Sequence, residues 1–216
     1  GAGTVCRESS ATGEPMNRPG SALTLLLFAV IGIGTTYLLQ RNSAPQIAAE
    51  QRLADSRKLL DMLPADSYDN QPLEQPLTLT EMSLSHSTLT AGFRATRNGQ
   101  TVAVLLRNQT EGYAATIELL IAIDTNGKLL GVKTLKQNET PALGGPIGDW
   151  PNHRLPPFPG QTRGEPNDAG WALKKDQGQF DQMAGATITS RAAINTSHDA
   201  LRYFDEHRSA LLGSAP

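Results

Sequence analysis

A short stretch before a predicted helix combines a carboxylate, small residues and two hydroxyl groups: residues 181–189, DQMAGATIT. Gly185 and Ala186 leave the backbone beside Thr187 almost bare, so a bulky group could reach the Thr187 hydroxyl without a clash. If Ser190 caps the following helix, free N–H groups there favour a bound anion such as a phosphate. The pattern therefore indicates a threonine that holds a phosphate or carries one covalently. The alternative is an ordinary loop followed by a helix cap.

The stretch resembles the flavinylation motif of bacterial respiratory flavoproteins, in which an Asp, two variable residues and Ser or Thr precede Gly-Ala-Thr. The resemblance implies that Thr187 carries flavin mononucleotide (FMN) through a phosphoester bond. It also implies that a separate flavin transferase installs the FMN from FAD and that Asp181 serves its recognition, although Asp181 taken alone is a solvated loop acid. Ala184 departs from the motif, because the family usually has Ser or Thr there. This change removes a possible hydrogen bond but leaves the acceptor hydroxyl.

The resemblance extends along most of the chain, to the G subunit family of the Rnf electron-transport complexes. The matching segments are residues 171–181 (WALKKDQGQFD), 112–113, 117–124 and 139–144 (ETPALG). The family pattern for the last segment is Glu-Thr-Pro-Gly-Leu-Gly, so Ala142 is a second departure. An alanine would be strained there if the position needs a positive φ. The chain also resembles the C subunit of the sodium-translocating quinone reductase, for which it is short.

The loop of residues 139–144 is expected to form a second wall of the flavin site, as the family resemblance implies. Pro141 fixes a turn, and Gly144 lets backbone N–H groups approach a ring edge. Tyr113 is expected to border the flavin. The alternatives are a simple Pro-Gly turn for the loop and an aromatic residue at the edge of the core for Tyr113. The candidate cofactor-binding residues are Thr187, Asp181, Gly185, Ala186, Thr189, Glu139, Thr140, Pro141, Leu143, Gly144, Tyr113 and Lys174.

Three basic residues near the motif, Lys174, Lys175 and Arg191, could add charge-assisted hydrogen bonds to a phosphodiester on Thr187. Such a group carries about one negative charge, which a helix N-terminus stabilises by roughly 0.3–1 kcal/mol at an exposed site. Each of the three, taken singly, is equally explained as a surface charge.

Composition excludes several other classes of function. The net charge of −2 and the absence of a basic stripe with interleaved aromatics give no indication of nucleic-acid binding. Cys6 is the single cysteine, which excludes an intrachain disulfide and an all-cysteine zinc or iron–sulfur site. The four histidines show no metal-ligand spacing. Any redox cofactor is therefore organic or belongs to a partner.

An apolar run near the N-terminus predicts a transmembrane helix over residues 19–40. No charge occurs between Arg18 and Arg41, and a bilayer span needs about 20 such residues. A cleaved signal peptide is the alternative, but its apolar core is usually about 7–15 residues long. Counting basic residues would place the C-terminal domain in the cytoplasm. The family resemblance implies the opposite, a soluble domain on the periplasmic side of the bacterial inner membrane, and we follow it.

Hydrophobic periodicity predicts an α+β fold, with a largely antiparallel sheet packed by helices. Alternation over residues 89–107, interrupted at Asn98-Gly99, predicts one hairpin, and residues 117–135 predict a second. Residues 190–207 follow a helical pattern. The predicted segments are a disordered N-terminus (1–18), the transmembrane helix (19–40), a stalk helix and linker (41–76), an FMN-binding domain (77–207) and a C-terminal tail (208–216).

The resemblance implies a membrane-anchored flavoprotein subunit of an Rnf-type complex that couples electron transfer to ion translocation. The subunit would relay electrons through FMN on Thr187, with the flavin supplying the redox chemistry. The chain has no nicotinamide motif and no second apolar span, so other subunits must supply electrons and move ions, and it is not catalytic alone. The alternatives are a structural or interaction subunit whose flavin site Ala184 and Ala142 have disabled, and a free-standing flavin-dependent reductase.

Overall fold

The computed structural model describes residues 25–35, 56, 59–64, 66–150 and 158–213. Two compact units are present, Gly1–Leu53 and Ala54–Pro216. In the first unit, residues 25–35 form a helix. No helix within the described ranges is both long enough and apolar enough to cross a bilayer. Most of the predicted stalk helix, the predicted disordered segment over 1–18 and the ends of the predicted span over 19–40 lie outside these ranges.

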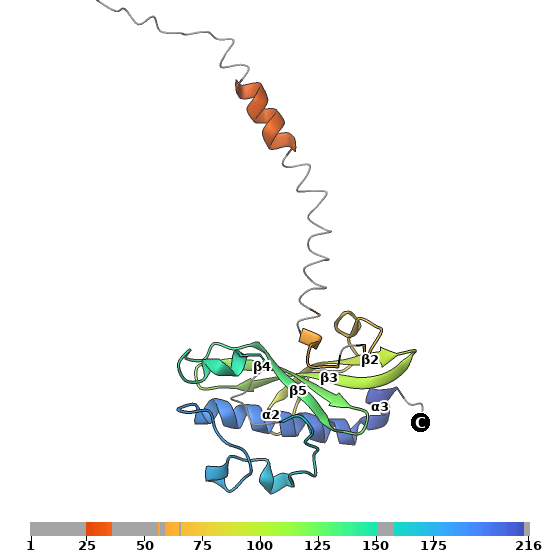
Figure 1. The fold of residues 1–216 in the computed structure, drawn as a ribbon, viewed down its shortest axis with the longest axis vertical. Coiled ribbons are helices and arrows are strands. Elements are labelled where there is room, and N and C mark those ends of the chain that lie inside the picture. The colour runs from red at the N-terminus through yellow and green to blue at the C-terminus, as the bar shows by residue number, and fades with distance from the viewer. Residues whose placement is uncertain (1–24, 36–55, 57–58, 65, 151–157, 214–216) are drawn as a thin grey trace, which may run out of the picture. The chain divides into compact units, whose positions relative to one another are not determined.

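The second unit is built on a five-stranded sheet in the order β1-β2-β3-β4-β5 (Figure 1). Each strand pairs antiparallel with the next one along the chain. The predicted α+β class with an antiparallel sheet is thus confirmed for this unit. The strands are β1 (Met82–Ser83), β2 (Thr88–Arg97), β3 (Gln100–Glu111), β4 (Thr116–Asp124) and β5 (Leu129–Lys136).

Both predicted hairpins form, because their turn residues suit tight connections. Arg97 pairs with Gln100 across Asn98 and Gly99, whose φ angles of 52° and 77° match a type I′ turn. In the second hairpin, the Asp124 carboxylate accepts from the backbone N–H groups at positions 126 and 128. The two turns therefore set the register of β2 with β3 and of β4 with β5.

One face of the sheet is covered by a single long helix, α2 (Thr187–Glu206), with the short α3 (Arg208–Leu212) after it (Figure 1). Ile194, Leu201 and Phe204 recur at helical spacing and are almost fully buried against the strands. Burial of this stripe orients α2, and its first residue lies at the end of the sheet where β3 turns into β4. The helix predicted from residue 190 is confirmed, but it begins three residues earlier than predicted.

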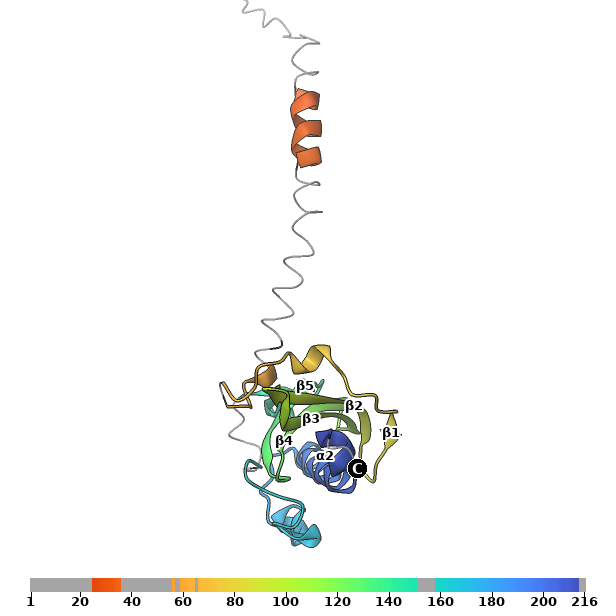
Figure 2. The ribbon, with the colours of Figure 1, turned by 90° about the vertical axis from the view of Figure 1, so that its right-hand side faces the viewer.

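The opposite face of the sheet is covered by the chain that precedes β1 (Figure 2). Leu60 and Leu63 pack with Leu105 and Leu120 in a second apolar cluster. The described residues between 64 and 76, within the predicted stalk helix and linker, contribute partly buried side chains here and the 3-10 helix η1 (Pro72–Glu74). Because both faces are buried, β4 is apolar at every position from 119 to 123 instead of alternating.

Residues 138–180 form long connections with three further 3-10 helices, η2 (Gly145–Gly148), η3 (Asp168–Gly170) and η4 (Lys174–Asp176), in their described parts. Phe158, Trp171 and Phe180 pack their rings together, and Trp171 stacks on His198 of α2 with 5.2 Å between ring centroids. This aromatic contact fixes the segment that leads into the motif against the middle of α2.

Candidate flavin-binding site

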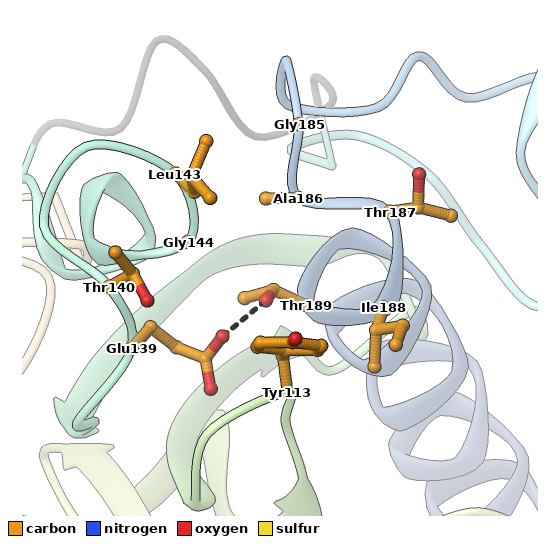
Figure 3. A pocket seen from close by; sticks show the side chains of 10 residues that line it. All are labelled: Tyr113, Glu139, Thr140, Leu143, Gly144, Gly185, Ala186, Thr187, Ile188 and Thr189. Atoms are coloured by element: carbon orange, nitrogen blue, oxygen red, sulfur yellow. Dashed lines mark hydrogen bonds between the residues drawn. The ribbon is translucent and has the colours of Figure 1, made fainter.

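A pocket of about 290 Å³ opens where three separate segments meet (Figure 3). These segments are the turn between β3 and β4, the loop after β5 and the first turn of α2. Small-molecule sites are typically about 300–1,000 Å³, so the pocket would enclose only part of a nucleotide-sized ligand. The lining residues are Tyr113, Glu139, Thr140, Leu143, Gly144, Gly185, Ala186, Thr187, Ile188 and Thr189.

Thr187 is the first residue of α2, so Ser190 lies inside this helix and does not cap it. Ala186 is the N-cap and makes no side-chain capping bond. Ser190 is fully buried, and its Oγ accepts from the Met183 N–H at 2.9 Å and donates to the Ala186 carbonyl at 2.8 Å. The serine thus fixes the bend that precedes the helix. Thr187 and its neighbours carry the N–H groups that an α-helix leaves without an internal partner.

Two glycines keep the space between the loop and the helix open. Gly185 has a φ of +73°, and a Cβ there would lie 2.7 Å from Leu143 Cδ2. A Cβ on Gly144 would lie 2.6 Å from Glu139 Oε2 and 2.8 Å from Thr189 Oγ1. Real Cβ atoms do not approach other atoms so closely, so a side chain at either position would displace the pocket wall.

Glu139 joins all three segments at the base of the pocket (Figure 3). Its side chain is buried; Oε2 accepts from Thr189 Oγ1 at 2.5 Å, and Oε1 accepts from the Ala114 N–H at 3.0 Å. A buried carboxylate is retained only when its oxygens have partners. The first contact therefore attaches the loop after β5 to α2, and the second attaches it to the turn between β3 and β4.

The Thr187 hydroxyl is held by two polar side chains outside the apolar part of the pocket. It donates to Gln182 Oε1 at 2.8 Å and accepts from Lys175 Nζ at 2.9 Å. Lys174, a predicted cofactor-binding residue, pairs with Asp181 at 2.6 Å. Neither Lys174 nor Asp181 lines the pocket.

Exposed apolar side chains gather at the mouth of the pocket. Tyr113 is 71% exposed, Leu143 45% and Ile188 46%. In the described part of the second unit, only Met82 joins them as an exposed large hydrophobic residue. Contiguous exposed apolar surface marks ligand grooves and interaction sites. The mouth of the pocket is therefore suited to bind a flat apolar group, which would remove these side chains from water.

The structure brings nine of the twelve sequence-predicted residues together around the pocket: Tyr113, Glu139, Thr140, Leu143, Gly144, Gly185, Ala186, Thr187 and Thr189. Pro141 lies instead in a neighbouring hollow beside Ala142. Ala142 has no positive φ, so the family departure at this position brings no backbone strain.

Sequence reasoning missed Ile188 as a lining residue and Gln182 as a partner of Thr187. Both belong to the motif itself. The available sequence signal for Ile188 was an isoleucine beside Thr187 at the start of a predicted helix, a position that usually faces solvent and is polar.

A family model described as FMN-binding domain matches residues 112–202, a range that contains every residue lining the pocket. The part of the chain over residues 112–202 is therefore an FMN-binding domain. The G subunit of the ion-translocating oxidoreductase complex of Pseudomonas aeruginosa strain UCBPP-PA14 is 42% identical over 205 residues, covering 94% of this chain and 95% of that protein. Proteins of the same name are 35% identical in Shewanella piezotolerans (91% and 93% covered) and 31% identical in Vibrio vulnificus (89% and 92%).

The chain thus belongs to the family of G subunits of ion-translocating oxidoreductase complexes, which confirms the resemblance drawn from its motifs. Among solved structures, the crystal structure of Shewanella oneidensis NqrC is similar, with 20% identity, a TM-score of 0.43, and coverage of 69% of this chain and 76% of that one.

Proposed function

We propose that this chain is a membrane-anchored flavoprotein subunit that relays electrons through FMN joined to Thr187 by a phosphoester bond. It would do so within an Rnf-type complex that couples electron transfer to ion translocation. One observation carries the proposal: Thr187 of the motif lies at a pocket completed by the loop of residues 139–144, which the resemblance assigned to the flavin. The match to the FMN-binding domain over residues 112–202 supports the same cofactor.

The residues around the pocket fit FMN at both of its ends. The phosphate would lie at Thr187, where the first turn of α2 offers unpaired N–H donors. The apolar mouth formed by Tyr113, Leu143 and Ile188 suits an aromatic ring system. Gly144 and Gly185 leave room that a side chain would fill. These are the residues that would hold the group.

When bound, FMN supplies the ability to accept and release electrons one at a time. The protein supplies orientation and surroundings. The buried Glu139–Thr189 contact would keep the two walls of the pocket at a fixed separation, and Tyr113 and Leu143 would shield the ring from water on their sides. A covalent bond would prevent loss of the cofactor on the periplasmic side of the inner membrane.

The remaining parts of the proposal concern partners. The relatives are named as subunits of a complex, so we propose that other subunits of that complex deliver and remove the electrons and move the ion. A flavin transferase would attach the FMN. The apolar run over residues 19–40 would anchor the chain in the bilayer as a single helix.

In-gel fluorescence of denatured protein tests the covalent bond. After co-expression with a flavin transferase, the wild-type band should fluoresce under ultraviolet light, and Thr187→Ala should abolish the signal because the acceptor oxygen is gone. Thr116→Ala, which removes an exposed threonine hydroxyl elsewhere, should leave it unchanged. Mass spectrometry of the peptide of residues 176–191 should place the adduct on Thr187. A dark wild-type band would favour a structural subunit with an empty flavin site.

A further inference from the structure

Lys175 is distinguished from the other cations near the motif by its partner. Lys174 pairs with Asp181 at 2.6 Å, and Arg191 pairs with a neighbouring carboxylate at 2.7 Å. Lys175 has no such carboxylate among the described residues, and its Nζ donates instead to Thr187 Oγ1 at 2.9 Å. Lys175 therefore places a positive charge without an acidic partner beside the Thr187 hydroxyl, the group that the motif indicates as the site of attachment.

The backbone fixes the position from which Lys175 reaches Thr187. Lys175 lies in η4, between Leu173 and Phe180, whose side chains are buried. The turn is closed by bonds from the Lys174 N–H to the Phe180 carbonyl at 2.7 Å and from the Gly178 N–H to the Leu173 carbonyl at 2.9 Å. The lysine thus extends from a tightly held turn, although its side chain is exposed.

The ammonium group of Lys175 is also in an unfavourable field in the unmodified chain. Thr187 is the first residue of a 20-residue helix, and the N-terminus of a helix carries a partial positive charge. A cation there is destabilising unless an anion accompanies it. A negative group at Thr187 would offset both the charge of Lys175 and the partial charge of the helix N-terminus.

We propose that Lys175 is the counter-ion of the phosphodiester at Thr187, an inference that rests on the proposed attachment of FMN. In that reaction the Thr187 Oγ–H bond breaks and an Oγ–P bond forms to the FMN phosphorus of FAD. The P–O bond of the FAD pyrophosphate breaks, AMP leaves with the bridging oxygen, and one proton is released. The product carries one negative charge, two bonds from the oxygen that Lys175 already contacts.

The test compares the free energy of unfolding of four species: the wild-type chain and Lys175→Gln, each with and without attached FMN. In the unmodified chain, Lys175→Gln should leave the unfolding equilibrium constant unchanged or lower it, because a cation is removed from the helix N-terminus. With FMN attached, the same substitution should raise that constant about 2- to 5-fold. Lys175→Arg should resemble wild type in both forms.

Lys128→Gln is the matched control, since Lys128 is an exposed lysine in the turn between β4 and β5. It should shift the unfolding constant equally with and without FMN. The effect of Lys175→Gln should also fade near 1 M salt, where the Debye length is about 3 Å.

An equal loss of stability in both forms would show that Lys175 is only structural and would overturn this inference while leaving the covalent flavin intact. Absence of FMN on the wild-type chain would overturn the proposed function and the inference together.

Discussion

At the scale of single residues, the pocket depends on positions where an added atom has no room. Gly144 packs against the Glu139 carboxylate and the Thr189 hydroxyl, the two groups that connect the loop after β5 to α2. Their hydrogen bond is buried, so neither group can move toward water without leaving the other unpaired.

Gly144→Ala tests this packing. The new methyl group would force the Glu139–Thr189 contact apart, and we expect a loss of about 1–3 kcal/mol in the free energy of unfolding, measured by urea denaturation. Attachment of FMN should slow as the pocket wall shifts. Gly164→Ala is the matched control, because nothing lies within 4 Å of a Cβ there. Equal stability of both variants would contradict the contact.

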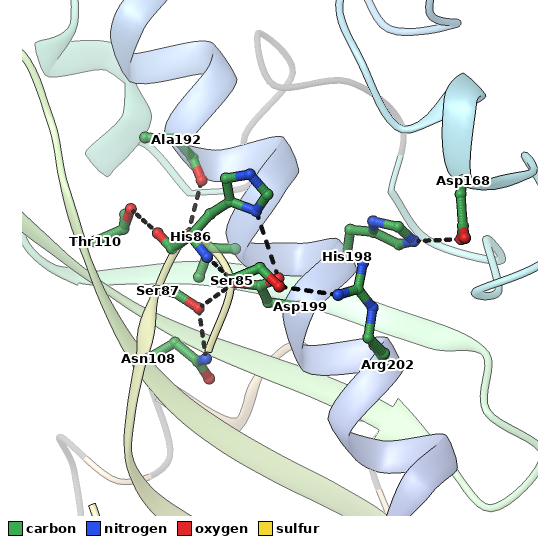
Figure 4. Close-up of polar contacts among 11 residues, drawn as sticks. Ser85, His86, Ser87, Asn108, Thr110, Asp168, Ala192, His198, Asp199 and Arg202 are labelled. Carbon is green, nitrogen blue, oxygen red and sulfur yellow. Dashed lines mark hydrogen bonds and ion pairs between the residues drawn. The ribbon is translucent and has the colours of Figure 1, made fainter. Parts of the chain in front are cut away.

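At the scale of elements, α2 positions the site through polar attachments along its length (Figure 4). The buried Asp199 carboxylate accepts from the His86 N–H at 2.7 Å and from Ser87 Oγ at 3.0 Å, which ties the turn before β2 to the helix. On the preceding residue of the helix, His198 Nε2 lies 3.1 Å from Asp168 Oδ1 in the long connection. The helix is therefore attached both to the turn before β2 and to the long connection after β5.

The attachment at His198 should depend on pH. Burial lowers the pKa of His198 from its ordinary value of 6.5, although the nearby Asp168 carboxylate opposes this shift. Above pH 6.5 the imidazole is neutral in both states and its contribution to stability is complete. As the pH falls through 6.5, the unfolded chain takes up the proton before the folded chain does. The contribution to stability therefore decreases until the pH is below the lower pKa of the folded state.

His198→Gln removes this titration. The free energy of unfolding of the wild-type chain relative to the variant should therefore fall between pH 7.5 and 5.5, measured by urea denaturation at a series of pH values. A relative stability that stays constant or rises toward acid would show that burial does not control this histidine.

At the scale of the whole domain, the sheet needs cover on both faces. Leu105 and Leu120 face away from α2 and are buried under Leu60 and Leu63. Each such leucine is worth roughly 1.5–3 kcal/mol when removed from water. The compact unit accordingly begins at Ala54.

This packing predicts how a shortened chain behaves. A chain of residues 54–213 should fold cooperatively in thermal denaturation, whereas a chain of residues 77–213 should lose that transition or aggregate, because its second apolar cluster faces water. Cooperative unfolding of the shorter chain at the same temperature would show that the preceding segment is dispensable.

The sequence alone was sufficient for the parts of this protein that depend on neighbours along the chain. Turn residues and the period of apolar positions determine both hairpins and the helix, and the motif places Thr187 beside small residues. The start of α2 was predicted wrongly at Ser190, because that hydroxyl is used in the bend before the helix and not as a cap. Local propensity could not distinguish these two uses of a serine.

Only the tertiary structure decided what lies across space from Thr187. Lys174 and Lys175 are adjacent and chemically alike, so the sequence could not assign one to Asp181 and the other to the threonine hydroxyl. Likewise, Glu139 and Thr189 are separated by 50 positions, and the burial that makes their hydrogen bond necessary arises only when α2 packs on the sheet. The sequence determines which groups the chain carries and how they are spaced, but packing determines which of them share one pocket.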